Sequence, residues 1–160
     1  MEDQTDIDVN LVWAHYPQNT HRFLGGNMPK TWVEKRDCGK TPHTKVLHKP
    51  FAGIPSGYTM LISSPQEIDE FIRQLPRGTT VSPLEMRKSL AKKHKADATC
   101  PVSTGIFFRI VCEAAIEERN QNTPLAEITP FWRVDLEGTS TASKLSIDKD
   151  ELKLLRASER

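Results

Sequence analysis

The sequence is poor in cysteine, and the three cysteines it has are not arranged for a metal site or a disulfide framework. Cys38, Cys100 and Cys112 form no CxxC pair, and their number is odd. Zinc modules and small disulfide-stabilised domains need paired, closely spaced cysteines, so both classes are excluded. The nearby His43 and His48 follow no standard ligand spacing. We therefore expect no metal, no cofactor, and a reducing, cytoplasmic compartment.

Long hydrophobic runs are also missing. The most apolar run, residues 106–116, contains Arg109 and Glu113, whereas crossing a bilayer takes about 20 apolar residues in succession. The first three residues, MED, are acidic, whereas signal peptides begin with a basic segment followed by an apolar one. We predict no signal peptide, no membrane span and no membrane partner.

The sequence has almost no net charge. Its 160 residues carry 22 Lys and Arg against 21 Asp and Glu, a formal charge of +1. A strong basic excess would indicate a general binder of polyanions, but this balance does not. Any nucleic-acid site must therefore rest on a local cluster of cations.

The N-terminal third, residues 1–56, lacks a sustained period of 2 or 3.6 residues, the signature of an amphipathic element. We expect it to be an extended or partly disordered arm that precedes one folded domain, residues 57–160. Four aromatic residues lie in the arm: Trp13, Tyr16, Phe23 and Trp32. Such side chains are costly to leave in water, so we expect the arm to be anchored across the domain.

Within residues 57–160 the sequence predicts a short strand at 58–62 and then four helices. The segments SPQE and SPLE, starting at Ser64 and Ser82, each offer a serine cap, a proline at the first helical position and a glutamate that completes a capping box. These caps predict helices from about 65 to 75 and from about 83 to 94. A wide apolar stripe predicts a third helix over 103–120, and a short helix over 150–157 follows.

The segment ITPFWRVDL, residues 128–136, alternates between its two faces and predicts a strand. Trp132 falls on one face and Phe131 on the other, and we expect Trp132 in the core and Phe131 beside a pocket. Two helices joined by a short turn, followed by a strand, indicate a winged helix-turn-helix domain. The expected fold is therefore mainly α with a small β component.

Three segments in this order, LPRGTTVSPLEMRKSLAKK, STGIFFRIV and ITPFWRV, resemble the DNA-binding domain of the alkylguanine-DNA alkyltransferases and the alkyltransferase-like proteins. The similarity is greater to a divergent bacterial branch, in which TCP…TGIF…R and TP-aromatic-WRV segments recur. It covers roughly residues 31–156, with the motifs between 76 and 134. The resemblance implies a winged-helix, DNA-binding protein.

In the active members of that family a Pro-Cys-His-Arg-Val segment supplies the cysteine that accepts the alkyl group. Pro130, Arg133 and Val134 match it here, but Phe131 stands at the cysteine and Trp132 at the histidine. Alkyl transfer needs a thiolate and a base to form it, so we predict no alkyl transfer. The resemblance then implies a pocket formed by Pro130, Phe131 and Arg133.

Two further positions bear on the chemistry. Pro83 stands where the family has a tyrosine that pushes on the phosphate of a flipped nucleotide. Cys100 precedes a predicted helix start, where the helix dipole can lower a thiol pKa. A nucleophile relocated to Cys100 is thus an alternative, although a small packing role is commoner for such a cysteine.

The candidate DNA contacts lie on the second and third predicted helices. Arg109 matches the intercalating arginine of the family, and the helix start at Ser103, Thr104 and Gly105 would approach the DNA. The basic residues Arg87, Lys88, Lys92, Lys93, His94 and Lys95 could contact phosphates. Two alternatives stay open: a solvated helix face for the cluster, and a salt bridge from Arg109 to Glu113.

These observations predict a non-catalytic, alkyltransferase-like protein that binds DNA, with alkylated or otherwise damaged DNA as the implied target. Glu113, Glu117 and Glu118 on the third helix would repel phosphate. The alternative is therefore a protein-interaction or regulatory module that keeps the fold without binding nucleic acid.

Overall fold

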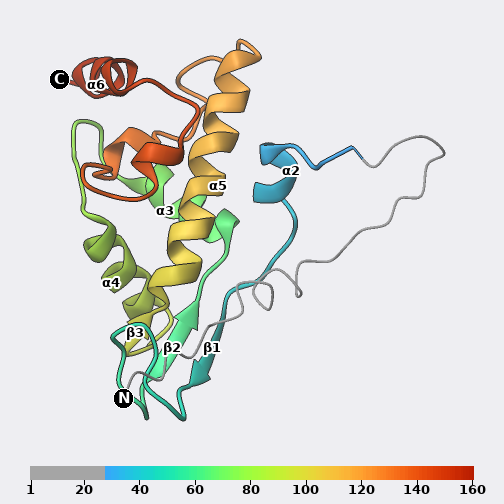
Figure 1. Ribbon diagram of the computed structural model, residues 1–160. Coiled ribbons are helices and arrows are strands. Elements are labelled where there is room, and N and C mark those ends of the chain that lie inside the picture. The colour runs from blue at the N-terminus through green and yellow to red at the C-terminus, as the bar shows by residue number, and fades with distance from the viewer. Residues whose placement is uncertain (1–27) are drawn as a thin grey trace.

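The computed structural model describes residues 28–160, which combine helices with a small sheet (Figure 1). Trp13, Tyr16 and Phe23 of the predicted arm lie outside this range. The elements in chain order are α2 (Trp32–Arg36), β1 (His43–Val46), β2 (Thr59–Ile62), α3 (Pro65–Gln74), α4 (Pro83–Lys93), β3 (Ala98–Thr99), α5 (Pro101–Asn120), the 3-10 turns η1 (Phe131–Arg133) and η2 (Ala142–Lys144), and α6 (Lys149–Ala157). A largely helical chain with little sheet was predicted, and this coarse statement is confirmed.

The sheet has three strands in the order β1-β2-β3. β1 pairs antiparallel with β2, with Thr44 opposite Leu61, and β2 pairs parallel with β3, with Met60 opposite Ala98. Only β2, with its buried Met60 and Leu61, was predicted. All four residues of β1 are exposed, so its side chains carry no alternation of apolar and polar residues that could reveal a strand.

Serine caps begin α3 and α4 as predicted. The Ser82 side chain accepts a hydrogen bond from Glu85 N at 3.1 Å, and Glu85 returns one from Ser82 N at 2.7 Å, which completes the capping box. At α3, Ser64 caps Glu67 N, but the expected return bond is absent. The Glu67 carboxylate instead accepts from Ser63 at 2.7 Å and contacts His94.

Helix α5 lies at the centre of the core. Phe107, Phe108 and Ile110, which point to different faces of the helix, are each at most 3% exposed. A helix that is apolar on several sides must be covered on several sides, and α5 packs against both α2 and α3 (Figure 1). None of the helices in residues 28–160 combines the length and apolar composition needed to cross a bilayer.

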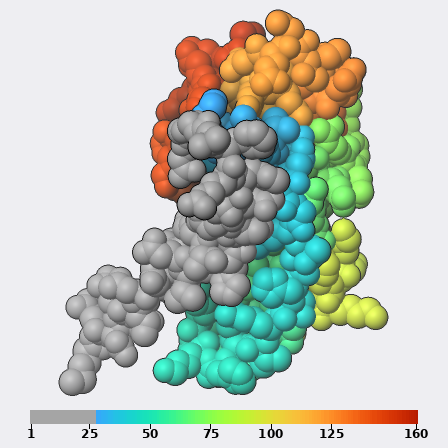
Figure 2. Space-filling model, turned by 90° about the vertical axis from the view of Figure 1, so that its right-hand side faces the viewer, coloured from blue at the N-terminus to red at the C-terminus, as the bar shows by residue number. Residues whose placement is uncertain are grey.

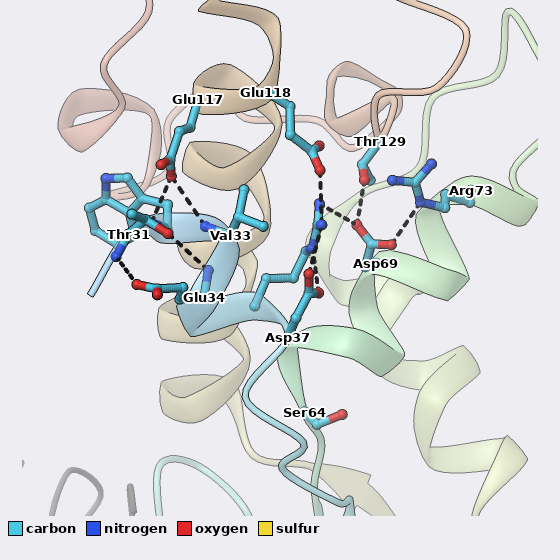
Figure 3. A network of polar contacts seen from close by, with 12 residues as sticks. Thr31, Val33, Glu34, Asp37, Ser64, Asp69, Arg73, Glu117, Glu118 and Thr129 are labelled. Carbon is cyan, nitrogen blue, oxygen red and sulfur yellow. Dashed lines mark hydrogen bonds and ion pairs between the residues drawn. The ribbon is translucent and has the colours of Figure 1, made fainter. Parts of the chain in front are cut away.

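The part of the predicted arm that the structure describes is not simply extended, because it includes α2 and β1. Figure 2 shows these residues, blue to teal, along one face of the molecule. The expected anchoring is present: the backbone N–H of Trp32 donates to Glu117 at 2.7 Å. The 8%-exposed Arg36 donates to Asp37 at 2.8 Å and to Glu118 at 2.9 Å (Figure 3). Glu117 and Glu118, expected to repel phosphate, therefore hold α2.

Residues 128–136 form no regular strand, contrary to the prediction. Phe131–Arg133 is a 3-10 turn, in which Arg133 N donates to Pro130 O at 2.9 Å, and a single bridge joins Val134 to Val81. The proline at position 130 has no N–H to give to a ladder, and one bridge does not extend into a sheet. Phe131 and Trp132 are both buried, with ring centroids 5.5 Å apart, so Trp132 is in the core as predicted and Phe131 is there too.

Candidate nucleic-acid interface

A groove with a volume of about 750 Å³ lies beside α4, between that helix, β3 and the turn at residues 52–54. The helical repeat explains its composition, since positions 84, 87, 88, 91 and 92 share one face of α4. Ala91 contributes to the apolar floor together with Ile54, Ala98 and Pro101. Leu84 is 51% exposed and lies on this face.

Three predicted phosphate contacts, Arg87, Lys88 and Lys92, line this groove together. Arg87 is half-buried, and Lys88 and Lys92 are exposed. Within residues 28–160 none of their side chains has a carboxylate within 4.0 Å, unlike the neighbouring Lys93, which reaches Glu67 at 3.1 Å. We name Arg87, Lys88 and Lys92 the α4 cation set.

The α4 groove has one acidic lining residue, Asp97, and its carboxylate is already engaged. Asp97 Oδ2 accepts a hydrogen bond from Thr59 N at 2.7 Å. That bond fixes the carboxylate to the start of β2. The Asp97 charge stays in the groove, but it is one carboxylate against the three cations of the α4 cation set, so the lining is net positive and favours an incoming anion.

The rest of the predicted basic cluster does not join this groove. Lys93 and His94 both contact the Glu67 carboxylate, which is 5% exposed. Burial alone would raise the pKa of Glu67, but hydrogen bonds from His94, Ser63 and Lys93 lower it. Lys95 follows the helix with a positive φ of 53°. The continuous run in the sequence is therefore divided between a surface groove and a structural contact.

The predicted start of the recognition helix is not exposed to solvent at Ser103 and Thr104. Ser103 and Thr104 are each 3% exposed, and Thr104 Oγ1 donates to Cys100 O at 2.7 Å. Their side chains have no route to a nucleic acid, because α5 is enclosed by the rest of the core. Gly105 is half-buried and lines a second hollow of about 340 Å³, which shares Pro101 with the α4 groove.

Arg109 also lines this second hollow, beside Trp32 of α2. Its guanidinium carbon lies 5.5 Å from the Trp32 ring centroid. The alternative of a salt bridge to Glu113 is present only as a long contact of 3.9 Å. Glu113 is 2% exposed and accepts from Ser146 N at 3.2 Å, so it does not face phosphate.

The predicted pocket residues are brought together only in part. Pro130 and Arg133 line a cleft of about 530 Å³ together with Trp132, whereas Phe131 is 1% exposed and is not part of its wall. The assignment of Phe131 to the pocket is therefore corrected, whereas Trp132 lies in the core as predicted and also borders the cleft. The 3-10 turn, unlike a strand, does not send successive side chains to opposite faces.

Cys100 and Cys112 are not presented to a substrate. Cys100 caps α5 and is 5% exposed, packed with Leu47, Ile54 and Met60. Cys112 is fully buried, and burial raises the pKa of its thiol well above the ordinary value. A thiol becomes a nucleophile only as an accessible thiolate, so the geometry favours packing roles for both.

Comparison with known proteins found no matching family model, no similar curated protein and no similar solved structure. The function must accordingly be argued from the geometry and charge of the sites themselves.

Proposed function

We propose that the protein binds nucleic acid without catalysis, holding the phosphate backbone in the α4 groove. The observation that carries this proposal is the convergence of the α4 cation set on one hollow, with no carboxylate of residues 28–160 within 4.0 Å of these three side chains. Lys and Arg side chains of this kind neutralise phosphates and release counterions, the sequence-independent part of nucleic-acid affinity.

The proposal keeps an alkyltransferase-like origin for the scaffold and gives it no alkyl-transfer chemistry. The buried Phe131 at the acceptor position supports this view. The α4 groove shares no lining residue with the cleft that Trp132 borders. Backbone binding in the α4 groove therefore does not require that a base be flipped, and preference for alkylated DNA is a separate question that the experiment addresses.

The test is fluorescence anisotropy of labelled duplex and single-stranded DNA, with and without an alkylguanine, over a series of salt concentrations. The variant R87Q/K88Q/K92Q removes the α4 cation set. We expect it to reduce the steepness of the salt dependence, log K against log salt, by about 3 for duplex DNA, close to 0.9 per lost phosphate contact.

The control variant K149Q/K153Q/R160Q removes the same charge from exposed positions at and after α6. If both variants weaken binding equally, the effect is one of net charge and the α4 groove is not the site. Tighter binding of the alkylguanine duplex would add lesion recognition to the proposal. Absence of binding to every strand at low salt would contradict it.

A second candidate function is favoured by Leu84. An exposed leucine above an apolar floor with cations at the rim also suits an amphipathic acidic peptide, as a protein-interaction module would require. Leu84→Ser separates the two functions: backbone binding of DNA should be unchanged by it, whereas binding of an acidic, leucine-containing peptide should fall at least about tenfold with the loss of one apolar anchor.

A further inference from the structure

The cleft that Pro130, Trp132 and Arg133 border lies where the end of α3, the turn η1 and the residues after α6 meet. Its volume is about 530 Å³, within the range of roughly 300–1,000 Å³ that is usual for small-molecule sites. It shares no residue with the α4 groove, and Figure 1 shows α6 and β3 toward opposite ends of the molecule. We name it the arginine cleft.

The lining of the arginine cleft is strongly basic, because it contains three arginines and one glutamate, Arg73, Arg77, Arg133 and Glu159. Arg133 is neutralised by Glu159 at 2.7 Å, and Arg73 pairs with Asp69 at 2.7 Å. Arg77 donates Nη2 to the neutral carbonyl of Ser158 at 2.9 Å and has no carboxylate within 4.0 Å in residues 28–160. A whole positive charge is therefore uncompensated at the cleft wall.

Arg73 and Arg77 also have guanidinium N–H groups that are not used in hydrogen bonds within residues 28–160. Arg73 uses Nε for Asp69 and Nη1 for the carbonyl of Glu127. Among the described residues its Nη2 has no acceptor, and neither have Nε and Nη1 of Arg77. Guanidinium groups match the planar geometry of carboxylate and phosphate oxygens, so these atoms can receive an oxyanion.

One carboxylate already occupies this wall. Glu159 accepts from Arg133 Nε at 3.0 Å and from the backbone N–H of Gly78 at 3.0 Å. Gly78 has a positive φ of 76°, the left-handed conformation that glycine adopts readily, and thereby turns its N–H to the carboxylate. Arg133 and the Gly78 N–H thus already bind one oxyanion, the Glu159 carboxylate, in the same cleft wall that contains Arg77.

The remaining lining is apolar and includes a flat side chain. Ile128, Pro130 and Trp132 are buried, and Leu125 is 43% exposed at the edge. Cations beside an apolar and aromatic floor select a ligand with two parts, a flat apolar body and an acidic group. A bare inorganic anion would leave the floor uncovered.

We propose that the arginine cleft binds a small molecule consisting of a flat apolar body with a carboxylate or phosphate, whose oxyanion is held by Arg77 with support from Arg73. The proposal is independent of nucleic-acid binding, because its residues lie outside the α4 groove. Carboxylate and phosphate share the same recognition chemistry, and the probes below distinguish them.

The experiment uses the full-length chain labelled with ¹⁵N and follows the indole N–H of Trp132 and the Nε–H of Arg77 during titration. The probes are benzoate, phenyl phosphate and benzamide, the last being the neutral counterpart of benzoate. We expect both signals to shift saturably with benzoate or phenyl phosphate. Benzamide should bind at least about tenfold more weakly, because the site recognises a charged hydrogen-bonding group. The tighter of the two anions identifies the acidic group.

Three variants locate the site. Arg77→Gln should weaken binding of the preferred anion at least about tenfold, and Arg77→Lys should weaken it less, because it keeps the charge but loses the planar fork. Lys153→Gln removes one charge from an exposed position on α6 outside the cleft and should leave binding unchanged. Any of three results would overturn the proposal. Arg77→Gln could bind the anion as tightly as the original chain, benzamide could bind as tightly as benzoate, or neither anion could cause a shift up to about 10 mM.

Discussion

Arg133 holds the carboxylate of Glu159 with two of its nitrogens, Nε at 3.0 Å and Nη2 at 2.7 Å, while its Nη1 donates to Leu75 O at 2.6 Å. One guanidinium therefore connects η1, the end of α3 and the segment after α6. Burial alone would raise the pKa of Glu159, but the hydrogen bonds from Arg133 and from the Gly78 N–H lower it to about 2, from an ordinary value of 4.5.

The first prediction concerns this ion pair. Because the folded-state pKa is lowered, the Glu159 carboxylate stabilises the fold fully above pH 4.5, and its contribution is lost as the pH falls from 4.5 toward about 2. Glu159→Gln should lower the free energy of unfolding by about 1–3 kcal/mol near neutral pH, and by progressively less in acid. Urea denaturation over this pH range measures the difference.

Glu137→Gln is the matched control for Glu159→Gln, since Glu137 is exposed and its substitution should change stability by less than about 0.5 kcal/mol. A Glu159→Gln variant that matched this control at every pH would contradict a stabilising ion pair.

The second prediction concerns Arg36, whose side chain is 10% exposed and faces Asp37, Asp69 and Glu118. Arg36→Met would leave these carboxylates without their shared cation, so we expect a loss of about 3 kcal/mol and faster amide exchange in α2. Lys45→Gln removes one charge from the exposed β1 and serves as the control. Unchanged exchange in α2 would show that the network does not hold this helix in place.

Local sequence signals were sufficient for the helices, because a capped helix is specified by residues three or four positions apart. Ser64, Ser82 and the apolar repeat of α5 gave boundaries within two or three residues of those observed. α2 carries the same kind of local signal, a capping box between Thr31 and Glu34, but its five residues are too few to show an apolar repeat. β1 depends on a partner far along the chain, Leu61 of β2, and no periodic signal marks that pairing.

The candidate site was predicted less completely than the fold. Arg87, Lys88 and Lys92 were predicted from the sequence as phosphate contacts, and Leu84, three and four residues before Arg87 and Lys88, lies on the same face of α4 by the helical repeat. The burial of Ser103 and Thr104 depends on how the whole core packs around α5. A pocket at Pro130 and Arg133 was predicted, but Glu159 lies 26 residues after Arg133, at a separation that no local pattern relates, so the ion pair in the arginine cleft could not be predicted.

The third prediction tests the absence of alkyl-transfer chemistry. Phe131→Cys restores the cysteine of the family motif at a position that is 1% exposed, next to Trp132 in place of the family's histidine. The new thiol lacks both access and a base to deprotonate it, so the intact mass should not increase after incubation with alkylguanine DNA. We also expect a loss of stability of about 3–4 kcal/mol from the cavity.

A thiol titration of folded Phe131→Cys provides the control for accessibility: the cysteine at 131 should react only after denaturation. A mass increase by one alkyl group in the folded variant would show that the introduced cysteine can accept an alkyl group and would contradict the prediction.

The last prediction separates Arg109 from the α4 cation set. The sequence resemblance assigns Arg109 to DNA, yet its guanidinium stacks near Trp32, and a cation held over an aromatic ring contributes about 0.5–1 kcal/mol to stability. Arg109→Ala should therefore lower the free energy of unfolding by about that amount and leave the salt dependence of DNA binding unchanged.

Arg87→Gln should leave the free energy of unfolding unchanged and reduce the salt slope of DNA binding by about 1, because the substitution removes one phosphate contact. If Arg109→Ala instead reduced the slope while Arg87→Gln did not, DNA would have to contact the hollow beside Trp32, and the interface would lie on α5 rather than in the α4 groove.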